Sequence, residues 1–157
     1  MPSALRFEPV AAVVGGRTEA VDDDWEGVEA IVRFDERFDA EALEGLDAFS
    51  HVEVIYVFDR VDPADVETGA RHPRGNEHWP RVGIFAQRAK DRPNRIGVSV
   101  CRLLRVDGRD VHVAGLDAVH GTPVLDLKPV MAEFAPRGEL RQPDWAAELM
   151  SGYWRSS

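Results

Sequence analysis

Hydrophobic residues in this chain come in short runs rich in β-branched side chains, and this pattern constrains the fold more than any other feature. Such runs predict β-strands, because branched side chains favour an extended backbone. The spacers between most runs are too short for the crossover helices that parallel strands require. We therefore expect a mainly β fold, a single-sheet antiparallel β-barrel with few short peripheral helices. The predicted strands are residues 10–14, 30–34, 52–58, 82–85, 96–106 and 111–114.

Turn and helix signals fill the remaining segments. Asp107-Gly108 separates the last two predicted strands and predicts a tight hairpin turn. Short helical segments are predicted at 39–46 and 63–67, and the clearest helix lies around 143–153, where Pro143 suits a first helical position. Its apolar stripe favours packing against the barrel or a second subunit over a role in cofactor binding. The stripe comprises Trp145, Leu149 and Tyr153.

The bulk properties indicate one domain spanning residues 1–157. No apolar run is long enough to cross a bilayer, and the N-terminus lacks the apolar block of a secretory signal, so we expect a cytoplasmic protein with no membrane partner. The single cysteine, Cys101, has no partner for an internal disulfide and lies among apolar neighbours. We expect a buried, inert thiol.

Charge is distributed unevenly along the chain. The formal net charge is −9, yet residues 71–105 hold nine of the 19 Lys and Arg and only two of the 28 Asp and Glu. Within this basic block, Arg92-Pro-Asn94 predicts a rigid turn, because proline fixes its own backbone angle and restricts the residue before it. Rigidly held guanidinium groups suit two-point contact with a carboxylate or phosphate. The alternative is a solvated basic hairpin tip.

Two further segments bear on chemistry. Residues 115–129 place polar side chains between glycines and prolines, which lets backbone groups approach a ligand closely. Residues 21–27 predict an acidic loop around one exposed indole, Trp25. For a metal site, His72 and His78 lie six positions apart without a second paired motif, and hydrogen-bonding or solvated histidines are the expected state. We expect no metal.

Taken together, these segments resemble the TrmO/TsaA-like (YaeB-type) family of S-adenosylmethionine-dependent tRNA methyltransferases. The likeness spans most of the chain from about residue 43 to residue 129. The strings that carry it are Phe49-Ser-His-Val52 with Val57-Phe58, Val82-Gly-Ile-Phe-Ala-Gln-Arg88, Arg92-Pro-Asn-Arg-Ile-Gly97, Gly115-Leu-Asp117 and Gly121-Thr-Pro-Val-Leu-Asp-Leu-Lys-Pro129.

The resemblance implies a homodimeric β-barrel methyltransferase that uses S-adenosyl-L-methionine and methylates N6 of threonylcarbamoyladenosine next to the tRNA anticodon. Our first hypothesis places Arg92, Asn94, Arg95, Asp126 and Lys128 around the acceptor, with Asp126 as the candidate general base. The residues it implies for cofactor binding are Asp24, Trp25, Asp59, Arg60, Arg88, Val98, Asp117, Ala118, Val119 and His120.

This sequence departs from the family pattern at three places. His120 stands where the family has aspartate, and Arg95 stands where it often has proline. The family's N-terminal Pro-Arg-Gln motif is missing, and Asp23-Asp24-Trp25 lies in about its position. For Trp25, covering the cofactor and ordinary packing are equal alternatives.

Two other functions stay open beside tRNA methylation. The acidic total charge argues against tight tRNA binding, whereas the basic block argues for it. A methyltransferase acting on a small molecule, and a non-catalytic module that binds S-adenosylmethionine, are the alternatives.

Overall fold

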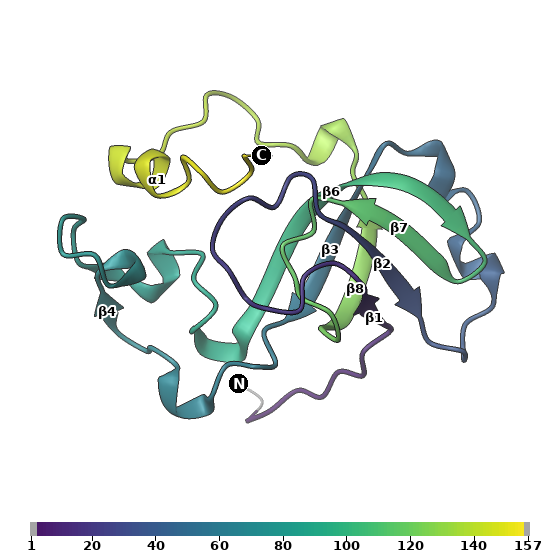
Figure 1. The fold of residues 1–157 in the computed structure, drawn as a ribbon, viewed down its shortest axis with the longest axis horizontal. Helices are drawn as coiled ribbons and strands as arrows, with labels where there is room; N and C mark the ends of the chain where they lie inside the picture. The colour runs from purple at the N-terminus through teal and green to yellow at the C-terminus, as the bar shows by residue number, and fades with distance from the viewer. Residues whose placement is uncertain (1–2, 156–157) are drawn as a thin grey trace.

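The computed structural model describes residues 3–155, and its centre is a closed barrel of antiparallel strands (Figure 1). The strand order around the barrel is β1-β2-β7-β6-β3-β8, and β8 pairs back onto β1. The prediction of a single-sheet antiparallel barrel with few short helices is confirmed. The barrel strands are β1 (Ala11–Val14), β2 (Glu29–Phe34), β3 (His51–Val57), β6 (Ile96–Asp107), β7 (Asp110–Ala114) and β8 (Pro123–Pro129).

Alternation of side chains along each strand builds the core. On β3, Val52, Val54 and Tyr56 are buried, while the residues between them are only partly covered. Because strand side chains point alternately to the two faces, one face of every strand fills the barrel interior. Cys101 belongs to this interior with 1% of its surface exposed, as predicted. The other fully buried valines are Val13, Val32, Val111, Val113 and Val124.

The predicted hairpin is present, and one predicted strand lies outside the barrel. Asp107 pairs with Asp110 across a turn in which Gly108 has a positive φ of 60°. The run 82–85 forms only the two-residue strand β5 (Val82–Gly83), which pairs with β4 (Ala70–Arg71) in a separate small sheet. The chain then turns into a 3₁₀-helix, Ile84–Ala86, which buries Ile84.

Strand β8 was not expected. Glycine and proline around residues 115–129 indicated turns, but the segment pairs with both β1 and β3. Its two prolines lie at its ends, where the missing backbone N–H groups cost few interstrand hydrogen bonds. Val124 is buried and Leu127 packs against the core, whereas Asp126 and Lys128 are exposed.

The helices are short and peripheral. Within residues 3–155 the single α-helix is α1 (Asp144–Leu149), shorter than the predicted 143–153. Pro143 keeps an extended backbone and serves as the N-cap, and Met150 is the C-cap. Among residues 3–155, no helix has the length and apolar character needed to span a bilayer. The remaining 3₁₀-helices are Ala40–Leu43, Leu46–Ala48, Pro63–Asp65, Pro73–Gly75, Pro93–Arg95 and Ala132–Phe134. The first and third lie where short helices were predicted, and the second only begins at the last residue of the predicted segment 39–46.

Candidate functional site

Three long connections meet at one end of the barrel. Strands β1, β3 and β7 end where β2, β6 and β8 begin, because Val14 pairs near the start of β2 and Val57 pairs with Ile96. The connections 15–28, 58–95 and 115–122 therefore emerge from the same barrel end. Both segments singled out in the sequence, the basic block and the turn after β7, contribute to this end.

Asp117 is the central acidic group of this end. Tyr56 donates a hydrogen bond to its Oδ1 over 2.9 Å, Ser99 donates to the same oxygen, and Tyr153 donates to Oδ2. Burial raises the pKa of the Asp117 carboxyl, and the hydroxyl bonds and the charge of Arg88 oppose that shift. Burial beside Asp117 likewise raises the pKa of the Tyr153 phenol. Both carboxylate oxygens are thus held by neutral donors inside the protein.

Three arginines of the basic block donate to neutral carbonyls, whereas Arg71, Arg74 and Arg102 pair with carboxylates. Arg88 bonds the Val98 carbonyl at 2.9 Å, Arg92 bonds that of Gln87 at 2.6 Å, and Arg95 bonds that of Val61 at 2.9 Å. Within residues 3–155, none of these three arginines forms an ion pair. A carbonyl fixes a guanidinium without cancelling its charge, so this end keeps full positive charges in an acidic protein.

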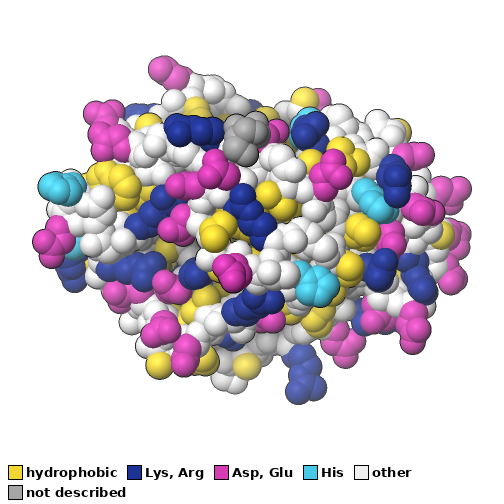
Figure 2. Space-filling model, viewed as in Figure 1, with side chains coloured by type: hydrophobic (Ala, Val, Ile, Leu, Met, Phe, Trp, Pro, Cys, Tyr) yellow, Lys and Arg dark blue, Asp and Glu magenta, His cyan; other side chains and the backbone are white. Residues whose placement is uncertain are grey.

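The tip that carries these arginines has an unusual backbone. Asn94 and Arg95 have positive φ angles of 63° and 52°, which non-glycine residues rarely adopt. The hydrogen bond from Phe58 N to the Arg95 carbonyl, at 2.8 Å, helps hold this turn against the chain that follows β3. On the face shown in Figure 2, basic and acidic side chains lie interspersed, with no uniformly basic field.

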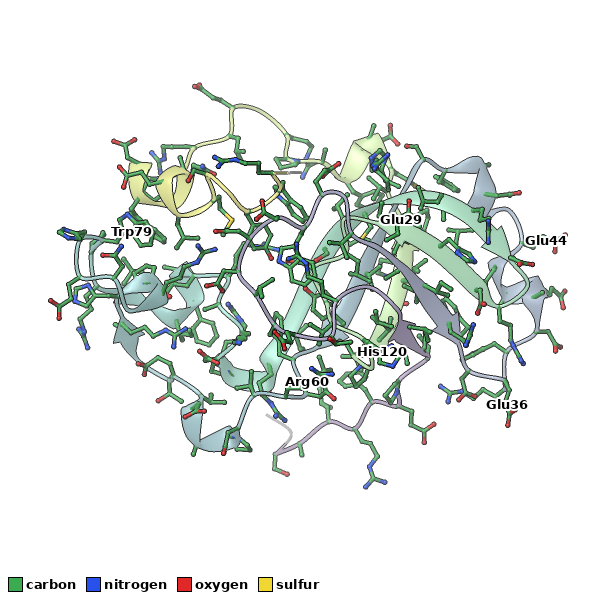
Figure 3. The ribbon with its side chains drawn as sticks, viewed as in Figure 1. Glu29, Glu36, Glu44, Arg60, Trp79 and His120 are labelled. Carbon is green, nitrogen blue, oxygen red and sulfur yellow. The ribbon has the colours of Figure 1, made fainter. Side chains whose placement is uncertain are left out.

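His120 joins the turn after β7 to the connection after β1. The Gly15 N–H donates to its Nδ1 at 3.0 Å, and the His120 N–H donates to the Arg17 carbonyl at 2.8 Å. Arg60 then bonds the carbonyls of His120 and Thr18 at 2.9 and 2.6 Å. Figure 3 shows Arg60 and His120 as neighbours at the centre of the view. His120 therefore supplies a hydrogen-bond acceptor, as an aspartate would.

The turn itself holds backbone donors that have no partner in the described part of the chain. Ala118 and Val119 are both buried, yet their backbone N–H groups have no hydrogen-bond partner within residues 3–155. Most backbone N–H groups of folded proteins are paired. Two adjacent donors beside Asp117 are therefore available to a ligand on this turn.

The predicted N-terminal contributors, Asp24 and Trp25, pair through their backbone N–H groups with the carbonyls of Gly152 and Tyr153, and one expectation about them is corrected. The Trp25 indole was expected to be exposed, but it is buried with 3% of its surface accessible. The Arg17 guanidinium lies over its ring at 4.5 Å and donates to the carbonyls of Asp23 and Asp24. This arrangement favours the packing alternative for Trp25, and it joins Asp24 through its backbone to Arg17 and Gly152.

Asp59 and Asp126 stand apart from the Asp117 cluster. Asp59 is exposed at the end of β3, beside Arg60. Asp126 faces outward from β8 opposite Ile55, and its carboxylate lies 3.3 Å from the ammonium of Lys128. Ile55 in turn lies opposite Val98, so Asp126 and Val98 share the outer face of the barrel. The structure therefore does not bring Asp126 together with Asp117, which points inward.

Sequence reasoning missed four residues of this end: Arg17, Tyr56, Ser99 and Tyr153. A serine at a buried position of an apolar strand was an available signal for Ser99. Tyr56 looked like an ordinary strand residue, and Tyr153 was assigned only to a packing stripe. Nothing in the local sequence of Arg17 indicated that its guanidinium would lie over Trp25.

Two other features lie outside the site. An open hollow of about 670 Å³ lies at the opposite end of the barrel and shares no residue with it. It is lined in part by Arg33 and Asp110, which form an ion pair at 2.9 Å. Among residues 3–155, no group of three or more His, Cys, Asp or Glu side chains is placed to hold a metal ion.

Comparison with known proteins gives a family match over most of the chain. The family described as the tRNA-methyltransferase O N-terminal domain matches residues 22–135. A human protein named tRNA (adenine(37)-N6)-methyltransferase is 36% identical over 102 residues, which cover 65% of this chain and 23% of the human protein. The Escherichia coli protein of the same name is 40% identical over 98 residues, which cover 59% of this chain and 40% of the length of the Escherichia coli protein.

Two further relatives complete the comparison. A Pyrococcus abyssi protein named a probable S-adenosyl-L-methionine-binding protein is 38% identical, covering 65% of this chain and 53% of its own length. The crystal structure of TrmO from Pseudomonas aeruginosa superposes with a TM-score of 0.73 at 26% identity, over 91% of this chain and 62% of that one. This chain thus spans less than two thirds of each of these relatives.

Proposed function

The chain belongs to the tRNA-methyltransferase O N-terminal domain family, and from this premise we propose that it is an S-adenosylmethionine-dependent methyltransferase acting on N6 of adenine 37 in tRNA. We further propose threonylcarbamoyladenosine as the form of that adenine that it modifies. The observation that carries the proposal is the pair of unpaired N–H groups at Ala118 and Val119, beside the half-buried Asp117.

The residues at the barrel end fit the proposed cofactor. An adenine ring offers acceptor nitrogens, which suit two adjacent backbone N–H donors. Arg88 keeps its charge and forms one hydrogen bond to a carbonyl, so its remaining N–H groups suit the cofactor carboxylate. The turn 117–120 and the backbone of Asp24, Arg60 and Val98 surround this position in the proposal. When bound, S-adenosylmethionine supplies an electrophilic methyl group on a sulfonium.

The contribution of the protein in this proposal is mainly alignment. In-line displacement depends on the acceptor nitrogen, the methyl group and the sulfur lying in one line. The hydrogen bonds of Arg60 and His120 join three connections, which limits their freedom to shift. We assign the general base to Asp126, whose carboxylate is solvent-accessible and paired with Lys128. Exchange of Asp126 for asparagine tests that assignment directly.

The acceptor side of the site is assigned to the basic tip. Arg92, Asn94 and Arg95 lie on a rigid turn, and the two arginines have no carboxylate partner in the described chain. These guanidinium charges suit contacts with the tRNA phosphates on either side of the nucleotide that is methylated. Lys128 on β8 is proposed to add a further phosphate contact from the outer face.

We propose a homodimer in the cytoplasm, formed by one domain covering residues 1–157. The support for a dimer is a run of exposed apolar side chains between β8 and α1, where Phe134 is 86% and Leu140 is 71% exposed. Trp154, after α1, is a further exposed apolar side chain. Light scattering during size-exclusion chromatography tests the assembly, and a monomeric mass would reject it.

The central test compares tRNA nucleosides from a strain lacking this protein with those of its parent. Loss of the N6-methylated nucleoside supports the proposal, and an unchanged level rejects tRNA as the acceptor. Titration of purified protein with S-adenosylmethionine, with Arg88→Ala as the comparison, tests the cofactor site separately. Binding that persists unchanged in this variant would reject the role of Arg88.

A second function is favoured by one observation. The net charge of −9 and the interspersed charges in Figure 2 suit a small acceptor better than a long polyanion. A small-molecule methyltransferase therefore remains the alternative, as does a module that binds S-adenosylmethionine without catalysis. Methylated products in a small-molecule extract, with tRNA nucleosides unchanged, would identify a small-molecule methyltransferase.

A further inference from the structure

The last residues of the described chain return to the candidate cofactor site. Asp24 N donates to the Gly152 carbonyl at 3.1 Å, and Trp25 N donates to the Tyr153 carbonyl at 2.9 Å. These contacts lay the chain end along the connection after β1. Residues 143–155, here called the C-terminal strap, lie outside the family match of 22–135. A segment beyond that match therefore adds contacts at the site.

A second attachment holds the other part of the strap. The Trp79 Nε1–H donates to Oε2 of Glu148 on α1 at 2.9 Å, and Figure 3 shows Trp79 directed toward that helix. Figure 1 shows α1 on the same side of the molecule as the segment around β4. The strap is thus attached at α1 through Glu148 and again at Gly152 and Tyr153.

The inner attachment reaches the Asp117 carboxylate. Tyr56 and Ser99 donate to Oδ1 of Asp117 from inside the barrel, whereas Tyr153 donates to Oδ2 from the strap. Without the Tyr153 hydroxyl, one oxygen of this half-buried carboxylate would lose its donor, and such losses cost stability. Asp117 begins the turn that carries the unpaired N–H groups of Ala118 and Val119. Tyr153 therefore fixes the position of those donors.

We propose that the C-terminal strap closes the cofactor site and that Tyr153, acting through Asp117, is a positioning residue for the turn 117–120. This inference rests on the proposed function for the identity of the ligand. The strap holds the turn in its binding conformation before the ligand arrives, so it strengthens binding without taking part in methyl transfer.

The test uses Tyr153→Phe, which keeps the ring and removes the hydroxyl. In ligand-free protein, hydrogen exchange of residues 115–121 should become about tenfold faster, the loss expected for one hydrogen bond to a charged group. S-adenosylhomocysteine, measured by titration calorimetry, should bind about tenfold more weakly. The KM for S-adenosylmethionine should rise with kcat unchanged, because the hydroxyl does not touch the reacting atoms.

The matched control is Trp79→Phe, which releases the strap only at α1. Exchange of residues 115–121 and binding of S-adenosylhomocysteine should stay within about twofold of the parent protein. Unchanged hydrogen exchange of residues 115–121 in Tyr153→Phe would overturn the proposed role of the strap, whether or not the ligand binds. Tighter binding in that variant would also overturn it, since Tyr153 would then compete with the ligand. Failure of the parent protein to bind would instead count against the proposed function.

Discussion

Gly97 lies directly against the ring of Tyr56. A Cβ atom at Gly97 would approach Cε2 of Tyr56 to 2.5 Å and Cζ to 2.6 Å, distances that atoms in folded proteins do not tolerate. The two residues are cross-strand partners on β6 and β3. Because the Tyr56 hydroxyl donates to Asp117, the absence of a side chain at Gly97 sets the position of the site carboxylate.

Gly97→Ala should therefore damage both stability and the site. The Tyr56 ring must move, and overpacking of this kind costs about 1–3 kcal/mol. Urea denaturation measures the loss, and calorimetric titration with S-adenosylhomocysteine measures the effect on the site. Gly83→Ala is the control, because a Cβ there meets no atom within 4 Å; its stability should stay within about 0.5 kcal/mol of the parent. Equal stability of the two variants would contradict the close contact.

The barrel was predictable because its strands repeat one simple pattern. Alternation and β-branching marked β1, β2, β3, β6 and β7, and the short spacers ruled out parallel pairing. Strand β8 was missed because Pro123 and Pro129 signal turns locally, and only pairing with two distant strands outweighs that signal. The separate pairing of β5 with β4 likewise depends on a contact that no local pattern reveals.

Only those parts of the candidate site that are contiguous in the sequence could be predicted. The resemblance pointed to the turn 117–120 and to Arg88, and both lie at the same barrel end. Tyr153 escaped notice because 36 positions separate it from Asp117, and a tyrosine on a helical stripe looks like a packing residue. Trp25 was expected to be exposed because its neighbours are acidic, yet Arg17 and the strap cover it.

Cys101 should be chemically silent in the folded protein. Burial raises the pKa of its thiol, and the reactive species is the thiolate. Reaction with Ellman's reagent should be at least roughly a thousandfold slower in native buffer than in denaturant, because unfolding costs on the order of 5 kcal/mol or more. Cys101→Ser should abolish the signal in denaturant as well. Rapid labelling of native protein would show that the barrel interior opens easily.

The free energy of unfolding should depend on pH in a way that reflects the titration of Asp117. Burial raises the pKa of this carboxyl above its ordinary value of 3.8, so the folded chain binds the proton more tightly than the unfolded chain. The stability that the tighter proton binding contributes is fully present below pH 3.8, and it is lost as the pH rises through the pKa of the folded protein. The free energy of unfolding of the parent minus that of Asp117→Asn should therefore fall as pH rises and then level off.

Urea titrations of both proteins across this acidic range measure that difference. Groups that titrate equally in both proteins cancel, including Asp110, whose carboxyl pKa is lowered by its hydrogen bond to Arg33. A difference that increases with pH would mean that hydroxyl bonds and Arg88 outweigh burial at Asp117.

His120 should be replaceable by aspartate but not by alanine. Its Nδ1 accepts the Gly15 N–H at 3.0 Å, and a carboxylate oxygen at this position can accept the same bond. Alanine leaves that donor without a protein partner, which should lower the free energy of unfolding by about 0.5–1.5 kcal/mol. His120→Asp should match the parent within about 0.5 kcal/mol. Urea denaturation of the three proteins gives these values, and hydrogen exchange at Gly15 reports the bond itself. Similar protection at Gly15 in the alanine variant would show that Arg60, through the carbonyls of Thr18 and His120, is enough to hold the two connections together.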